Sequence, residues 1–310
     1  MIFSDAHCDT ITLSMRKNES IYKNSCHLDI NRMKKTGFNH LQFFSIFYDK
    51  MRVKDVHQST NQAISFFKEQ ISYFNNDITL CRNYNDILTA FSDSKISAFL
   101  TIEGGEAIKD DLSLINYFYE QGVRSICLTW NHKNNIGSGV YSDSNENITP
   151  FGVDVIKRMN DLGMIVDVSH LSEKSFWDII SHSSHPIIAS HSNSKKICPH
   201  IRNLTNEQIL GIKKTGGFIG INLYPCFLAI NCEAEISDII KHIEHIAGIA
   251  GEDILGFGCD FDGVDCLPHK INGIEDVSII INELLRLNYS DNLIKKISGK
   301  NLLKTIEKIC

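Results

Sequence analysis

The sequence predicts an α/β fold, a single (β/α)8 TIM barrel that occupies residues 1–310. Eight apolar runs alternate with stretches of helical periodicity, and such alternation indicates a parallel sheet. Polar clusters follow five of the runs, as at the rim of a barrel, where strand ends carry the active site. Eight β/α units in 310 residues fit one barrel, which needs roughly 250 residues plus insertions.

The strands are expected where apolar runs end at turn residues, because strands buried on both faces read as continuous Val, Ile, Leu and Phe. In chain order, these runs are residues 2–6, 41–46, 96–102, 124–128, 164–168, 186–189, 217–223 and 254–258. The polar segment 49–93, between the second and third strands, is expected to be helical. Amphipathic stretches at 172–180 and 237–249 predict further helices, and Ser237 is expected to cap the second.

Composition and charge exclude several classes of protein. A hydrophobic content of 43% is ample for a core, and a net charge of −6 argues against a nucleic-acid partner. No apolar run approaches the roughly 18 residues of a membrane span, and the chain enters a strand directly after Met1, so neither membrane nor signal peptide is expected. The ten cysteines have no CxxC spacing, which predicts reduced thiols in a cytoplasmic protein rather than a cysteine zinc site.

His7 and Asp9 are the first candidate metal ligands. Two residues apart on a strand, their side chains point to the same face. An imidazole with a carboxylate suits zinc better than calcium or magnesium. A lone HxD more often caps or hydrogen-bonds the backbone, but its place at the end of the first strand favours a site at the barrel rim.

Three further candidates follow later strands. Glu103 ends an apolar run and precedes two glycines, and a carboxylate between two cations is a common bridge. The alternative is a glutamate that caps a turn, and the nearby Glu106 competes for a functional role. His170 and His191 each follow a serine at the end of a run. On adjacent parallel strands about 4.8 Å apart, the two histidines favour a shared metal site over separate packing roles.

The last candidate is Asp260, which follows the eighth run. An ionised aspartate beside two metals can take a proton from an attacking water and pass it to a leaving amine. Asp167 is expected to accept a hydrogen bond behind the ligands. His132 is discussed below, and seven other histidines are predicted to pack or face solvent. They are His27, His57, His182, His185, His242, His245 and His269.

Taken together, the motifs HxD, EGG, IVDVSH, SHS and GFGCDFDG resemble, in this order, those of the membrane (renal) dipeptidase family of zinc dipeptidases, in its bacterial form. The resemblance covers residues 3–301 and includes the stretches GFNHLQFFS, HIRNLTNEQI and GIEDVS. It implies a barrel of the metal-dependent hydrolase type and a homodimer. It also implies two Zn²⁺ per chain and hydrolysis of dipeptides L-Xaa-L/D-Xaa by a hydroxide that bridges the ions.

The same resemblance assigns roles by motif. His7 and Asp9 match the ligands of one zinc, Glu103 the bridging ligand, and His170 and His191 the ligands of the other zinc. Further matches are Asp260 to the catalytic aspartate, Arg202 in HIRN to the arginine that binds the substrate carboxylate, and Tyr224 to a residue of the pocket wall.

The sequence departs from animal members of the family at one position. Those members place a substrate-binding histidine where this chain has Trp130, and His132 follows two residues later as a candidate for the role.

Two other functions stay open at this point. One is another amidohydrolase reaction on the same centre, on N-acyl amino acids, lactones or cyclic amides, and the other is a non-catalytic metal-binding barrel. Neither a GxSxG elbow nor a phosphate-binding GxxxxGK[ST] loop is present.

Overall fold

Eight parallel strands close into a barrel in the computed structural model, which describes residues 1–143 and 145–310. The strands follow the order β2-β1-β9-β8-β7-β6-β5-β4 around the barrel, and pairing of β2 with β4 closes it. Their bounds are β1 Ile2–Cys8, β2 Asn39–Phe47, β4 Ile96–Glu103, β5 Val123–Cys127, β6 Ile165–Asp167, β7 Ile187–Ala189, β8 Phe218–Ile221 and β9 Leu255–Phe257. All eight predicted strands and the barrel are therefore confirmed.

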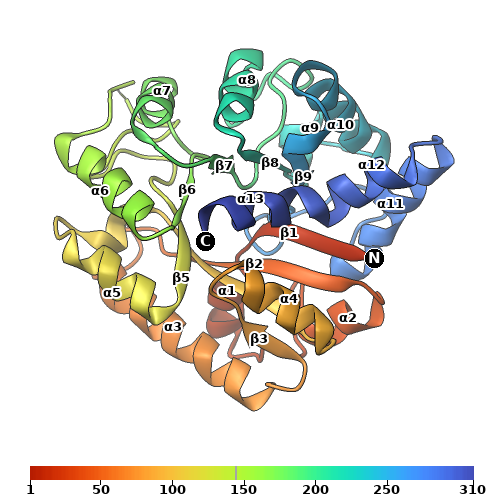
Figure 1. The fold of residues 1–310 in the computed structure, drawn as a ribbon, viewed down its shortest axis with the longest axis horizontal. Helices are drawn as coiled ribbons and strands as arrows, with labels where there is room; N and C mark the ends of the chain where they lie inside the picture. The colour runs from red at the N-terminus through yellow and green to blue at the C-terminus, as the bar shows by residue number, and fades with distance from the viewer. Residues whose placement is uncertain (144) are drawn as a thin grey trace.

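Helices surround the barrel (Figure 1). Their bounds are α1 Thr10–Lys17, α2 Ile30–Lys35, α3 Val56–Tyr73, α4 Tyr84–Ser92, α5 Ser113–Gln121, α6 Pro150–Asp161, α7 Glu173–His182, α8 Asn206–Thr215, α9 Pro225–Leu228, α10 Ile236–Ala250, α11 Val277–Arg286, α12 Asp291–Lys295 and α13 Asn301–Ile309. Several begin at an oxygen-bearing cap. Ser172 caps α7, and Thr205 forms a capping box with Gln208 at the start of α8.

Two local predictions were wrong. The segment 49–93 contains α3 and α4, as expected, but also a strand, β3 (Ile78–Leu80), which pairs with the start of β4. Three residues are too few to show an alternating pattern. Ser237 does not cap α10, because the helix begins at Ile236 and the Asp238 carboxylate accepts a hydrogen bond from the Glu235 amide.

The N-terminal half of the barrel interior is apolar and is closed by α13. Inward side chains of the strands form one buried cluster with Leu302, Ile306 and Ile309 of that helix. Phe43 and Phe99 stack at the centre of this cluster, with ring centroids 4.9 Å apart. Figure 1 shows α13 crossing the middle of the ring of strands. The end of the barrel opposite the C-terminal strand ends is therefore sealed.

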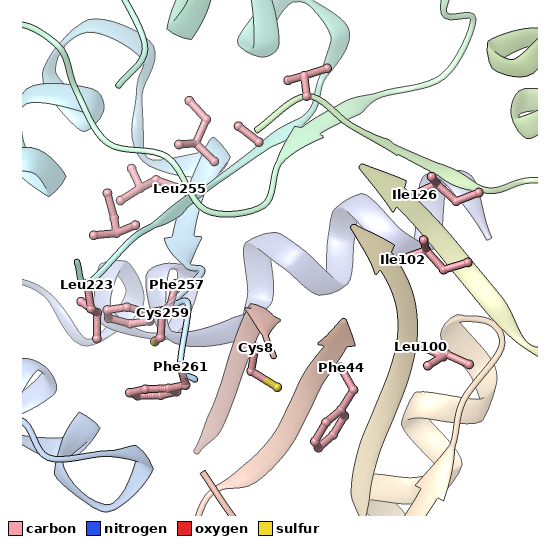
Figure 2. Close-up of a cluster of buried hydrophobic side chains, with 14 of the residues drawn as sticks. Cys8, Phe44, Leu100, Ile102, Ile126, Leu223, Leu255, Phe257, Cys259 and Phe261 are labelled. Carbon is pink, nitrogen blue, oxygen red and sulfur yellow. The ribbon is translucent and has the colours of Figure 1, made fainter. Parts of the chain in front are cut away.

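A second apolar cluster lies between the strands and the helices. Figure 2 shows side chains of this cluster on neighbouring strands, among them Phe44, Leu100 and Ile126. Phe44 contacts Phe67 of α3, with ring centroids 5.1 Å apart. Because Phe43 belongs to the inner cluster and Phe44 to the outer one, β2 buries both faces, as its continuous apolar sequence predicts. Among the described residues, no helix combines the length and the hydropathy that crossing a membrane requires.

We expect the free energy of unfolding to depend on pH through His40, at the start of β2. The imidazole is buried against Phe3 and Phe38, and burial lowers the pKa of His40 from 6.5 to about 4. Between these values the unfolded chain binds a proton that the folded chain does not. Stability contributed by neutral His40 is thus present above about pH 6.5 and declines toward pH 4, by about 3 kcal/mol.

Denaturant titrations of wild type and His40→Phe from about pH 7 to about pH 4.5 measure this contribution. Titration of other groups is common to the two proteins and cancels in the difference. The variant should lose less stability on acidification than wild type does. Equal losses in the two proteins would show that His40 is not buried as a neutral group.

Candidate metal centre

Six predicted site residues meet at the C-terminal rim of the barrel. His7 lies in β1, Asp9 directly follows it, and Glu103 is the last residue of β4. His170, His191 and Asp260 follow β6, β7 and β9 within three residues. The carboxyl ends of parallel strands share one rim, so residues distant in sequence converge there. All six are buried.

Glu103 stands between two groups of ligand atoms. One carboxylate oxygen lies 2.7 Å from His170 Nε2 and 3.6 Å from His191 Nε2, and the other lies 3.5 Å from His7 Nε2. Asp9 completes the second group, with Oδ2 3.4 Å from His7 Nε2. Each group offers three atoms within 4.8 Å of one another, a spacing that one metal ion can span.

Side chains behind the histidines orient their rings. His170 Nδ1 lies 2.9 Å from Asn131 Oδ1, which can only accept, so this nitrogen carries the proton. Ser190 donates its hydroxyl proton to Asp167 and therefore accepts from His191 Nδ1 at 2.8 Å. Both histidines are thus held with Nε2 as an unprotonated lone pair that faces the site, the tautomer a metal requires.

This arrangement fits a bound cation. His170 Nε2 and His191 Nε2 lie 2.8 Å apart, and both face Glu103, so three lone-pair donors point at one another. A positive ion between them would relieve that repulsion. Asp9 Oδ1 is buried and has no hydrogen-bond partner among the described residues, which is costly unless a ligand completes it. Imidazole and carboxylate donors together suit Zn²⁺.

Burial and neighbouring charges shift the pKa values of the site's histidines and of Asp9 in different directions. Burial lowers the pKa of His170 to about 4 and that of His191 well below its usual range, so both are neutral. Although burial opposes its charged form, the carboxylates of Glu103 and Asp9 raise the pKa of His7. Burial raises the pKa of Asp9 to about 7. Without metal, the second group of ligands therefore holds protons that a cation must displace.

Asp260 lies at the edge of both groups. Its Oδ1 is 3.8 Å from His7 Nε2, and its Oδ2 accepts a hydrogen bond from Asn222 at 2.8 Å. Burial raises its pKa, and its backbone has a φ of 61°, a strained value for a residue other than glycine. Gly263 leaves space for this carboxylate, because a Cβ there would overlap the oxygens of Asp260 and Asp9.

A cavity of about 1010 Å³ opens over the ligands. Arg202 and Tyr224 line it, as do Asp9, Glu103 and Asp260. Arg202 is buried, donates to the carbonyl oxygens of Ser169 and His191, and has no partner for its Nε among the described residues. The structure therefore brings Arg202 and Tyr224 together with the metal-ligand candidates.

Two other candidates lie outside this constellation. His132 is exposed and does not line the cavity, where Trp130 and Asn131 take its place. Trp130 packs against Phe47 with ring centroids 4.8 Å apart, and His132, two residues later, is exposed. Glu106 lies 3.9 Å from Lys50 Nζ and joins neither group of ligands. Of the two glutamates, only Glu103 faces the centre.

One expectation about cysteines was wrong. Cys226 and Cys232 form a disulfide, whereas the sequence predicted reduced thiols throughout. Both residues line the cavity, and the bond closes a short loop at its rim. A spacing of six residues is not among the recognisable metal or redox spacings, so the pattern gave no signal. The other eight cysteines are free, and six of them are buried.

Sequence reasoning also missed polar residues that support the site. Asn131 and Asn222 orient His170 and Asp260. Asp262 accepts hydrogen bonds from Thr10 and from the amide of His27, and so ties the start of α1 and the segment at His27 to the rim. The sequence offered one signal for such residues, a polar side chain close after an apolar run. The serines before His170 and His191 show the same pattern.

A comparison with protein families assigns the chain. The model of the membrane dipeptidase family, peptidase family M19, matches residues 1–310. The chain belongs to this family. Members of this metallopeptidase family hydrolyse dipeptides, which agrees with a metal-ligand cluster beneath a cavity.

Two solved structures share the whole fold of the M19 chain, and a further protein is similar to it in sequence. A crystal structure of the dipeptidase AC, a metallopeptidase of the same family, has a TM-score of 0.93 and 26% identity, and covers 100% of this chain and 98% of its own. A Rhodobacter sphaeroides metallopeptidase, solved with a phosphinate mimic of the dipeptide L-Ala-D-Ala, has a TM-score of 0.92 and 24% identity, over 100% and 99% of the chains. An uncharacterized Klebsiella pneumoniae protein from the pqqA 5' region is 33% identical over 80% of this chain and 95% of its own.

We expect Ser190→Ala to weaken Zn²⁺ binding by about 10- to 100-fold, because the ring of His191 then loses the acceptor that fixes its tautomer. Competition with a chromophoric chelator measures the affinity, and ¹⁵N chemical shifts of the metal-free protein report the tautomer of His191. Ser192→Ala is the matched control, since the Ser192 hydroxyl is buried next to His191 without a partner in the described chain. Equal affinities of the two variants would contradict a role of Ser190.

Proposed function

We propose that the chain is a single-domain binuclear zinc dipeptidase that hydrolyses dipeptides of the form L-Xaa-L/D-Xaa. The observation that carries this is Glu103, whose two oxygens face two different groups of ligands. His7 and Asp9 would hold one ion and His170 and His191 the other, with Glu103 shared. When bound, the ions would supply Lewis acidity for the scissile carbonyl and acidify the attacking water.

Metal analysis and a substrate panel test the proposal together. Protein purified with excess Zn²⁺ should retain two ions per chain and hydrolyse dipeptides faster than N-acyl amino acids, lactones or cyclic amides. Glu103→Gln should weaken both ions together, because it removes the shared charge. One tightly held ion in the wild type would contradict the binuclear centre, and loaded protein without activity on any dipeptide would contradict the reaction.

Arg202 would bind the free carboxylate of the substrate. Its guanidinium is buried in the cavity wall, and the unpartnered Nε leaves part of its donor fork available. A bidentate pair between guanidinium and carboxylate favours short substrates with a free C-terminus over long peptides. Tyr224, half-buried beside it, would form part of the wall around the C-terminal residue.

We expect Arg202→Ala to raise KM for dipeptides by about 30-fold or more, because removing one partner of such a pair costs about 2–5 kcal/mol. Amidation of the substrate C-terminus should impair wild type strongly and the variant little. Metal content should be measured alongside, since Arg202 also donates to the carbonyl oxygen of His191. Equal losses on amidation in both proteins, with the metals in place, would exclude carboxylate recognition by Arg202.

Asp260 would carry the proton from the attacking water to the leaving amine. It is buried and held by Asn222, and burial raises its pKa toward the range in which a carboxylate can both accept and release a proton. We expect Asp260→Asn to keep two metals while kcat falls about 10²- to 10⁴-fold. Loss of one metal in this variant would instead assign Asp260 as a ligand, and near-normal kcat would remove it from the mechanism.

The homodimer stays a prediction from the family resemblance, and the cytoplasmic location stays a prediction from the cysteine pattern. Light scattering of the purified protein measures the first and cell fractionation the second. His132 has no place in the proposed site, and Asn131 and Trp130 occupy the cavity wall where a substrate-binding histidine was expected.

A further inference from the structure

The cavity has two walls of different character on opposite sides of the barrel. Arg202 lies on the segment that follows β7. In the ring of strands β2 is four strands from β7 in either direction, so the loops after β2 lie across the barrel from Arg202. The ligand atoms of His7, Glu103 and His191 stand on the strand ends at the floor of the cavity, between the two walls. A small substrate anchored on Arg202 therefore extends over the ligands toward the β1 and β2 loops.

The wall on the β1 and β2 side presents two cations above an aromatic base. Arg16 projects from α1 and Arg52 from the loop after β2, and both line the cavity. The rings of Phe47, at the end of β2, and Trp130 pack against each other at an interplanar angle of 44° and form the base. In the part of the chain that the structure describes, no carboxylate lies within salt-bridge distance of Arg16. Arg52 has one partner, Asp49 at 3.4 Å, and is largely solvent-exposed.

The opposite wall is mainly apolar around Arg202. Tyr224, Phe227 and Ile230 line it, and Phe227 lies under the guanidinium, 5.6 Å from its carbon. Arg202 is buried and held by backbone carbonyls, whereas Arg16 and Arg52 are exposed. Arg202 is therefore the rigid anchor for the carboxylate that every dipeptide carries. The exposed pair is free to bind a group that only some dipeptides carry.

Building on the proposed dipeptidase activity, we infer that the β1 and β2 wall is the subsite for the N-terminal residue and that it selects an acidic side chain, Asp or Glu. With the substrate carboxylate on Arg202 and the scissile bond over the ligands, the N-terminal side chain reaches toward Arg16 and Arg52. A carboxylate there gains Coulomb attraction from two guanidinium groups, while its methylenes contact Phe47. A lysine side chain at the same place would be repelled.

The test compares dipeptides that differ in the N-terminal side chain, with Glu and Gln as the isosteric pair. The metal-loaded enzyme is assayed with L-Glu-L-Ala, L-Gln-L-Ala, L-Lys-L-Ala and L-Ala-L-Ala in wild type, Arg16→Gln, Arg52→Gln and the double variant. In wild type, kcat/KM for L-Glu-L-Ala should exceed that for L-Gln-L-Ala by about fivefold, as expected for two partly solvated charge pairs. The ratio should approach one in the double variant and should fall in wild type as salt is raised.

Lys17→Gln is the matched control, because it removes the same charge one residue along α1. The Lys17 side chain instead contacts Ser25 and does not line the cavity, so this variant should keep the ratio of wild type. A ratio near one in wild type, or one that survives in the double variant, overturns the acidic subsite. Equal losses on L-Glu-L-Ala and L-Gln-L-Ala in the double variant also overturn it, since the arginines would then bind a group common to all dipeptides. Cleavage of no dipeptide at all would instead refute the proposed function, and the subsite with it.

Discussion

The carboxylate of Glu103, buried between the imidazoles of His7, His170 and His191, is the interaction on which the rest of the site depends. No other group in the described chain contacts all three rings at distances of 2.7–3.6 Å. A buried carboxylate needs compensating positive charge, which protons on His7 and Asp9 supply in part in the metal-free site and which bound cations would supply in full. The metal requirement of the M19 family therefore corresponds, in this chain, to the buried negative charge of Glu103 at the end of β4.

The barrel can hold such a polar centre because its interior is divided. The N-terminal half is filled by apolar side chains and sealed by α13, while the C-terminal half carries ligands and the groups that orient them. Asp167, Ser190 and His191 form a hydrogen-bonded chain in which His191 donates to Ser190 and Ser190 donates to Asp167. Glycines at 220 and 258 allow this chain to fit, since a Cβ at either position would overlap the carbonyl of Ser190. Rigidity around the ligands therefore comes from packing below and hydrogen bonding behind.

The walls of the cavity are the part of the site that family membership leaves free. The metal-ligand candidates stand on strand ends, whereas Arg16, Arg52 and the loop closed by Cys226 and Cys232 stand on helices and loops. Loops over a fixed strand scaffold can change without cost to the core, which is how barrels acquire new substrates. In the proposed function, one buried arginine and two exposed ones would give the two ends of a dipeptide separate recognition elements.

The sequence by itself determined the barrel strands and the six ligand and acid candidates, because a strand buried on both faces leaves a continuous apolar run and the residues after it lie on the rim. Only the tertiary structure decided what depends on distances between segments far apart in sequence. It separated Glu103 from Glu106, turned His132 out of the cavity behind Trp130, and joined Cys226 to Cys232. It also revealed β3, whose three residues pair only because β4 is there to receive them. The local sequence pattern determines the face of the strand or helix on which a side chain lies. The packing of loops against one another determines which residues that side chain contacts.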